Sequence, residues 1–154
     1  MEIRLRRGFT LIELIIVISL IAILAGIYIV IGNPAGQLAQ ARNQKRISDL
    51  QTIMLAIRDN IDNQGNEQFS CSAGPIPTST TDMSSASGGY DIAPCLTQYH
   101  VIYSMPFDPN ASGTHYASNS DYDTGYSIII NSSTGQITLS APYAELGKTI
   151  TLTQ

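Results

Sequence analysis

Positive charge is nearly missing from most of this 154-residue chain. After Gln64 the only cation is Lys148, while the same stretch carries seven carboxylates: Glu67, Asp82, Asp91, Asp108, Asp121, Asp123 and Glu145. An acidic surface repels phosphate backbones, so we expect no direct binding of nucleic acid by this region. Three of the eight basic residues of the chain, Arg4, Arg6 and Arg7, fall instead within its first seven positions.

Patterns typical of catalysis are also missing. The chain has no glycine-rich phosphate loop, and no grouping of Ser, His and Asp occurs in a supporting context. The two histidines, His100 and His115, combine with the two cysteines in no usual zinc-binding spacing. We therefore expect no catalytic residues, no cofactor and no metal, and hence a protein that is not an enzyme.

One long apolar segment dominates the N-terminal part. Residues 9–31 carry a single charge, Glu13, and as a helix they would extend ~34 Å, enough to cross a bilayer. The arginines before the segment should stay in the cytoplasm, which sends the C-terminal part outward. A secretory signal peptide has a shorter apolar core, of about 7–15 residues, and the small-x-small pattern Ala39-Gln40-Ala41 lies well beyond the segment. We therefore expect the segment to be retained.

A helical pattern continues after this segment. Gly32 and Pro34 predict a kink or a frayed turn. Beyond them apolar residues recur at spacings of three and four, with charged residues mostly between them. These apolar residues are Leu38, Ile47, Leu50, Ile53, Met54, Ile57 and Ile61, and the charged ones are Arg42, Lys45, Arg46, Asp49, Arg58 and Asp59. The pattern predicts a helix over residues 9–62, stopping near Gly65, whose second half buries one apolar face.

The remainder of the chain favours short strands. Residues 65–90 are rich in turn-forming residues and are predicted to form a long surface loop. Residues 114–118, 124–131, 136–141 and 148–153 have the β-branched content of strands, and residues 131–135 predict a hairpin turn. The only apolar partner for such a sheet is the Ile47–Ile61 stripe. The predicted fold class is therefore α+β, with a long N-terminal helix packed against a small C-terminal antiparallel β-sheet.

The run Gly8-Phe9-Thr10-Leu11-Ile12-Glu13-Leu14, with a basic leader before it and an apolar helix after it, closely resembles the processing signature of type IV prepilins and type II secretion pseudopilins. More weakly, residues 105–116 are similar to the turn that precedes the sheet in many of these proteins. The resemblance implies cleavage after Gly8 by prepilin peptidase, N-methylation of Phe9 and a role for Glu13 in subunit assembly. One departure is visible, because the helix proline of pilins commonly lies about one turn earlier, where this chain has Val30.

The resemblance also implies an organisation and a set of partners. Residues 1–8 would be a cleaved leader, 9–32 a transmembrane and filament-core helix, 33–62 its amphipathic continuation and 63–154 a headgroup. The expected partners are other copies of the chain in a helical filament, prepilin peptidase, an inner-membrane assembly platform and, before assembly, membrane lipid. The filament would be periplasmic or extracellular. The sequence leaves open whether it is a pilus or a secretion pseudopilus.

Glu13 has a physical interpretation of its own. An unpaired charge within a membrane helix costs roughly 2.5–3.5 kcal/mol. The new ammonium at Phe9 of a neighbouring copy could offset that cost and set the stagger between helices. Two alternatives remain: Glu13 reaches the cytoplasmic headgroups, or the chain is a single-pass anchored binding module that never polymerises.

Two weaker patterns lie in the C-terminal part. Cys71 and Cys95 fall in the region expected outside the cytoplasm, where we favour a disulfide, worth roughly 3 kcal/mol, over two free thiols. Neither cysteine lies near the apolar segment, so a lipid anchor is not expected. Asn119, Asp121 and Asp123 alternate as in a calcium loop but lack the closing acidic residue. We favour Asx-rich turns over a calcium site there.

Overall fold

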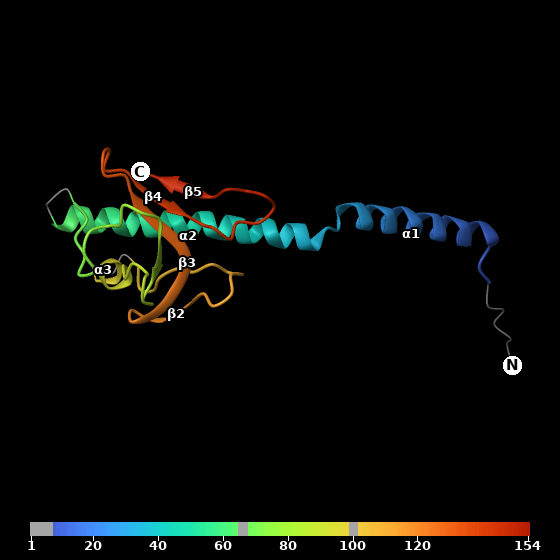
Figure 1. Cartoon of the computed structure of the whole chain (residues 1–154). Coiled ribbons are helices and arrows are strands. Elements are labelled where there is room, and N and C mark those ends of the chain that lie inside the picture. The colour runs from blue at the N-terminus through green and yellow to red at the C-terminus, as the bar shows by residue number, and fades with distance from the viewer. Residues whose placement is uncertain (1–7, 65–67, 99–101) are drawn as a thin grey trace. The chain divides into compact units, whose positions relative to one another are not determined.

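The computed structural model describes residues 8–64, 68–98 and 102–154. Leader residues 1–7, the predicted helix stop Gly65 and His100 lie outside this description. The chain forms two compact units, Met1–Gln37 and Leu38–Gln154. Two long helices come first in the chain and five strands follow, with one short helix among them (Figure 1). The predicted α+β class is therefore confirmed.

At the predicted weak point of the long helix, one helix ends and a second helix begins. Helix α1 spans Leu11–Ile31 and α2 spans Pro34–Gln64. The backbone N–H of Gly32 donates to the carbonyl of Tyr28 (2.9 Å), and a Cβ at Gly32 would lie 2.6 Å from that oxygen, so only glycine fits this close approach. Asn33 then caps α2 by accepting from the N–H of Gly36 (3.0 Å). Pro34 is tolerated at the first helical position because the N–H it lacks would have no helical partner there.

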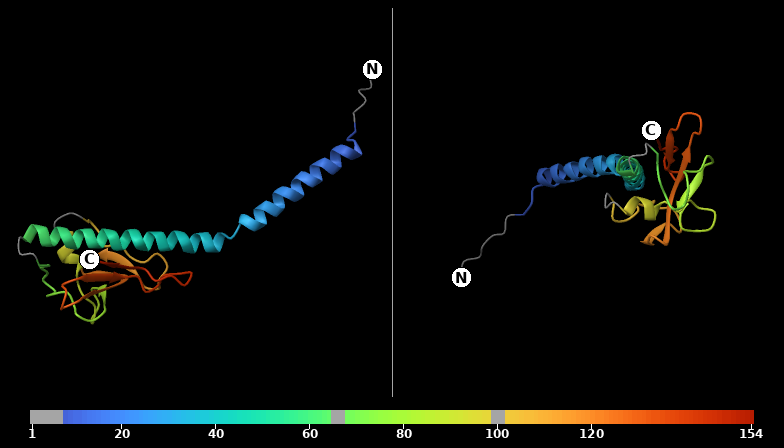
Figure 2. Two further views of the ribbon diagram at one scale, coloured as in Figure 1. Left: turned by 90° about the horizontal axis from the view of Figure 1, so that it is seen from above. Right: turned by 90° about the vertical axis from the view of Figure 1, so that its left-hand side faces the viewer.

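The second unit contains a five-stranded antiparallel sheet. Its strands are β1 (Thr81–Ser84), β2 (His115–Ser118), β3 (Asp121–Ile130), β4 (Ile137–Ser140) and β5 (Thr151–Thr153). The order is β1-β3-β4-β5, and β2 also pairs with β3. The predicted hairpin between β3 and β4 is confirmed, with Gly135 N–H donating to the carbonyl of Asn131 (2.7 Å). Both views in Figure 2 place the sheet on one side of α2.

One strand falls where a surface loop was predicted. Within residues 65–90, that prediction is wrong for β1, which pairs with the long strand β3 through Thr81↔Ile128 and Asp82↔Ser127. Met83 is the only large apolar residue of β1 and is fully buried. Because Asp82 and Ser84 have little strand preference, pairing with β3 and burial of the Met83 side chain decide the conformation of β1. A short helix, α3 (Ala93–Thr97), follows β1 in the chain.

The apolar core lies between α2 and the sheet. The stripe predicted on α2 is buried at Leu50, Ile53 and Ile57, which pack with Tyr126, Ile128 and Leu139 of the strands. The prediction is wrong at the N-terminal end of the stripe, where Leu38 and Ile47 are 59% and 37% exposed. In that part of α2 polar side chains are buried instead: Asn43, Arg46 and Asp49.

A buried ion pair connects α2 to the segment before β2. Arg46 and Asp108 both have fully buried side chains, and the guanidinium donates to both carboxylate oxygens, from Nε (2.7 Å) and from Nη2 (3.0 Å). The same carboxylate accepts the backbone N–H groups of Asn110 and Ala111, each at 2.9 Å. Burial by itself would raise the pKa of Asp108, but these hydrogen bonds hold it below its ordinary value. The pair is therefore fully hydrogen-bonded, as a buried charge requires.

A second carboxylate fastens the loop between β4 and β5 to the same part of α2. Glu145 accepts two hydrogen bonds from Arg42 (2.6 and 2.7 Å) and one from Arg46 (2.9 Å). Its backbone N–H and carbonyl both bond to the side-chain amide of Asn43, at 2.9 and 2.8 Å. The sequence pattern gave no sign that Arg42 and Arg46 are paired, because their carboxylate partners lie far along the chain.

A disulfide closes the segment that follows α2. Cys71 and Cys95 are bonded to each other across a separation of 24 residues. The buried side chain of Asn60, near the end of α2, donates to the carbonyl of Cys95 and accepts from the N–H of Ser70, both at 3.1 Å. The bridged segment, which includes β1, is therefore connected to α2 by hydrogen bonds close to the disulfide.

The buried pair predicts a large loss of stability when one partner is removed. Arg46→Leu should lower the free energy of unfolding by about 3–5 kcal/mol because it leaves the Asp108 carboxylate buried without its counter-charge. Arg58→Leu is the control, since Arg58 is an exposed residue of the same helix. Its loss should cost about 0.5 kcal/mol or less. Urea denaturation of the detergent-solubilised chain, followed by circular dichroism, measures both; equal losses would contradict this account.

The pKa of Glu145 predicts sensitivity to acid. Hydrogen bonds from Arg42 and then Arg46 lower this pKa from 4.5 to about 2. Because the folded state binds the proton less readily than the unfolded state, Glu145 stabilises the fold above pH 4.5, and this contribution disappears between pH 4.5 and about 2. The urea midpoint of the wild type should fall through this range. In Glu145→Gln the fall should be smaller, and an unchanged profile would count against the assignment.

Candidate functional site

The N-terminal end of α1 contains an N-cap that sequence reasoning missed. Thr10 has extended backbone angles (φ −81°, ψ 150°), and its Oγ1 accepts the backbone N–H of Glu13 at 3.3 Å. Its carbonyl accepts the first helical hydrogen bond, from the N–H of Leu14 (3.2 Å). The pattern Thr-x-x-Glu just before an apolar run is the sequence signal of a capping box and could have identified this cap.

Glu13 lies in the first turn of α1. A carboxylate at this end of a helix interacts favourably with the unpaired N–H groups and the helix dipole, by roughly 0.3–1 kcal/mol at exposed positions. The cap and the dipole therefore explain part of the tolerance for a charge at this position. They supply no counter-charge, and the Glu13 side chain is exposed, so it is accessible to a cation from outside the chain.

The side chains of helix α1 that the structure describes are all exposed. Its large hydrophobic residues are exposed on every face, from Tyr28 at 79% to Val17 at 44%. By length and composition it is apolar enough to cross a membrane. A continuous apolar surface of this kind is rarely left in water. The helix therefore requires surroundings of lipid or of other protein.

Gly8 and Phe9, which precede α1, are exposed to solvent. The Phe9 side chain is 81% exposed, and a Cβ added at Gly8 would meet nothing within 4 Å. Because the fold of this chain does not require glycine at position 8, any requirement for it would come from a protein that acts on this peptide bond.

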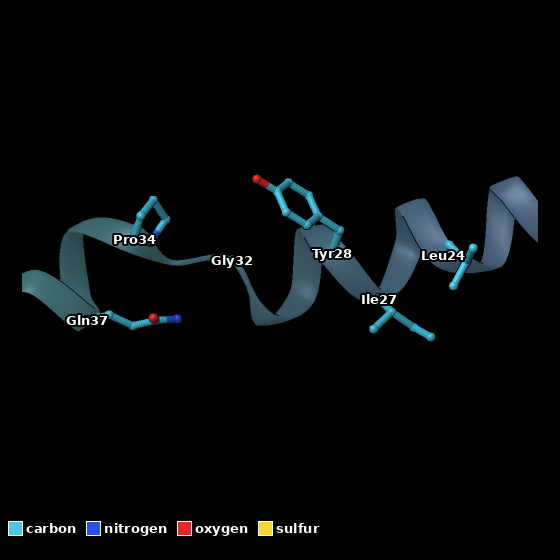
Figure 3. Close-up of a pocket in the computed structure, with 6 residues that line it drawn as sticks. All are labelled: Leu24, Ile27, Tyr28, Gly32, Pro34 and Gln37. Carbon is cyan, nitrogen blue, oxygen red and sulfur yellow. The ribbon is translucent and has the colours of Figure 1, made fainter.

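An open hollow lies at the interruption between the helices. It has a volume of about 670 Å³ and is lined by Leu24, Ile27, Tyr28, Gly32, Pro34 and Gln37. Figure 3 shows Tyr28 and Pro34 on either side of Gly32. The lining offers no carboxylate, histidine or cysteine for acid–base or nucleophilic chemistry.

The residues of the calcium-like pattern have separate partners. Asn119 accepts from the hydroxyl of Tyr116 (2.7 Å), Asp121 lies 3.0 Å from the Nε2 of His115, and Asp123 accepts from the N–H of Gly125 (2.9 Å). Within the described part of the chain, no three His, Cys, Asp or Glu side chains gather as they would around a metal ion.

One protein-family model matches the N-terminal part of the chain. The model of the prokaryotic N-terminal methylation motif matches residues 3–29, which include Gly8, Phe9, Glu13 and most of α1. The chain carries a type IV prepilin-like signature. This signature supports a pilin- or pseudopilin-like substrate of prepilin peptidase. Together with the apolar helix, the prepilin-like signature is consistent with anchoring in a membrane.

No match was found among curated proteins or solved structures. The family match covers residues 3–29, which all lie in the first unit.

The open backbone at Gly8 predicts a selective effect on processing. When the chain is expressed with prepilin peptidase, Gly8→Leu should abolish cleavage and leave residues 1–8 attached, because a bulky side chain blocks approach to the peptide bond. Gly26→Ala is the matched control, since a Cβ there also meets nothing within 4 Å. Intact-mass analysis should show the control fully processed, and cleavage of Gly8→Leu would contradict the assignment.

Proposed function

We propose that the chain is a structural subunit of a helical filament, either a type IV pilus or a type II secretion pseudopilus. It is inserted in the membrane with its N-terminus in the cytoplasm, cleaved after Gly8, methylated at Phe9 and assembled through α1. The observation that carries this proposal is the prepilin-like signature on a helix whose apolar residues are exposed on every face.

Cleavage changes the charge at the start of α1. Hydrolysis of the Gly8–Phe9 amide consumes one water, and it leaves a carboxylate on the leader and an amine on Phe9. An α-amine has a pKa of about 7.7–8.0, so most of it is an ammonium at neutral pH. The mature chain therefore begins with a cation four residues before Glu13, at the edge of the apolar segment.

Glu13 acquires its function from this new cation. A charge within a membrane helix costs roughly 2.5–3.5 kcal/mol on insertion scales, of which the Thr10 cap and the helix dipole offset a part. The Phe9 ammonium of an adjacent copy offsets the remainder. Because this pairing joins fixed positions on two helices, it also sets the axial stagger between copies.

The contacts between copies are head-to-tail, so each added copy leaves a free surface for the next one. A heterologous interface that combines a rotation with a rise continues indefinitely, which is the requirement for a fibre. The apolar helices lie at the centre and the second unit faces outward. Before assembly the helix resides in lipid, and an inner-membrane platform transfers it to the growing filament.

Glu13→Gln tests the pairing step. It removes the charge but keeps the shape of the side chain, so cleavage and methylation should continue while the yield of filaments falls at least about tenfold. Asp62→Asn is the matched control, because Asp62 is an exposed acid that has no hydrogen bond or ion pair in the described part of the chain. Sheared-filament yield and the mass of the N-terminal peptide measure the two effects.

Three outcomes would count against the proposal. Normal filament yield from Glu13→Gln would overturn the pairing step. Native chains that retain residues 1–8, or that stay solitary in the membrane after cleavage, would instead favour an anchored binding module that does not polymerise.

A further inference from the structure

The connection between β4 and β5 contains a turn with an unusual sequence. Leu146 and Gly147 have φ angles of 60° and 64°, and the N–H of Lys148 donates to the carbonyl of Glu145 (3.2 Å). A four-residue turn with positive φ at both central positions strongly favours Asn-Gly, because a branched side chain is strained there. Leu146 is the only residue other than glycine with a positive φ in the described part of the chain. The turn by itself therefore gives no reason for a leucine at this position.

The leucine side chain is also largely outside the core. Leu146 is 57% exposed, and Tyr143, three positions earlier in the same connection, is 55% exposed. Glu145, which lies between them, is ion-paired with Arg42 and Arg46 and so fixes the connection to α2. Two large side chains are thus presented to the outside from a fixed position. A strained residue kept exposed in a well-anchored connection indicates a contact outside the chain.

These side chains lie near the start of the second unit. Leu38, one helical turn before Arg42 on the same side of α2, is 59% exposed, and Arg42 binds Glu145 of the connection. Figures 1 and 2 show the red connection between β4 and β5 extending along α2 toward its N-terminal part. Residues 32–37 join Leu38 to the end of α1, and a chain of this length spans at most about 25 Å. This part of the second unit is therefore close to whatever surrounds α1.

The connection also carries the single cation of the C-terminal part. Lys148, the only lysine or arginine after α2, is exposed two positions beyond Leu146. The ion pairs of the described residues do not include it, because the nearby Glu145 is bound to α2 instead. A tyrosine, a leucine and an unpaired lysine together suit a lipid surface. There the aromatic ring prefers the headgroup region, the leucine enters the acyl boundary and the ammonium meets lipid phosphate.

We propose that the connection between β4 and β5 binds the phospholipid surface beside α1. Tyr143 and Leu146 enter the headgroup region, and the Lys148 ammonium binds lipid phosphate. The inference rests on the proposed function, which places α1 in a membrane before assembly, and it adds a second lipid contact from the second unit. This contact accounts together for the strained leucine, the exposed tyrosine and the position of the cation. A second copy of the chain would offer Lys148 no phosphate.

Quenching by lipid tests the contact in single chains. Thr149→Cys places a thiol beside the proposed contact, and Ser132→Cys places one in the exposed turn between β3 and β4, while the native cysteines stay in their disulfide. Each full-length variant is labelled with bimane and inserted, one copy per disc, into nanodiscs of phosphatidylcholine and phosphatidylglycerol. Some headgroups carry a nitroxide, which should quench the label at position 149 at least about threefold more than at position 132.

A turn-compatible substitution separates the contact from the fold. Leu146→Asn suits the positive φ, so the unfolding temperature in detergent should stay equal or rise, while quenching at position 149 should fall to the level at position 132. Leu55→Asn is the matched control, because Leu55 on α2 is 59% exposed, and it should leave the quenching unchanged. A marked fall in the unfolding temperature of Leu146→Asn would show that the leucine serves the fold, which would overturn the inference.

Charge reversal tests the cation separately. Lys148→Glu should reduce quenching at position 149 at least about twofold, because the ammonium no longer holds the connection at lipid phosphate. Arg58→Glu makes the same change of charge at an exposed position of α2 and should have no effect. Equal quenching in the two variants would remove Lys148 from the proposed contact and overturn the inference as stated.

The remaining outcomes separate this inference from the proposed function. If the chain enters the discs but positions 149 and 132 are quenched equally, the connection does not bind lipid, and the filament proposal stands. If position 149 becomes protected from water only in filaments, a second copy covers the connection, which also overturns the lipid contact. If the chain neither enters the discs nor loses residues 1–8 to prepilin peptidase, the proposed function fails, and this inference with it.

Discussion

The guanidinium of Arg46 is the group on which the second unit depends. It bonds to Asp108 in the segment before β2 and to Glu145 in the loop between β4 and β5. One side chain of α2 therefore fixes two connections that lie on different parts of the sheet. The geometry allows the charge to be buried because both carboxylates bring further hydrogen bonds, from backbone N–H groups to Asp108 and from Arg42 to Glu145. These ion pairs hold the two connecting segments against α2, beside the apolar core that α2 forms with the strands.

The same cluster shapes the outer surface of α2. With Arg42, Arg46 and Asp49 directed to the sheet and its connecting segments, the exposed residues Ala41, Gln44, Ser48, Gln51 and Leu55 carry only amides, a hydroxyl and small or apolar groups. The side chains of Arg42 and Arg46 therefore stabilise the fold through their ion pairs and are not available to the exposed surface of α2.

The candidate site could be located almost entirely from the sequence. Gly8, Phe9 and Glu13 occur in one contiguous run, and the apolar character of α1 follows from composition alone, so no tertiary contact was needed to find them. Thr10 was missed although its signal, a threonine three residues before a glutamate, is equally local. Strand β1 gave no comparable signal, because only the pairing with β3 makes its residues extended.

The sequence by itself determined the helical character of residues 9–62 with a weak point at Gly32 and Pro34, the hairpin before β4 and the processing signature, because each depends on residues within a few positions of one another. The tertiary structure alone decided that Arg46 and Asp49 of α2 are buried. The partners of Arg46 lie 62 and 99 residues away in the chain. A periodic pattern assigns charged residues to solvent by default, and only distant carboxylates, brought close by folding, can reverse that assignment.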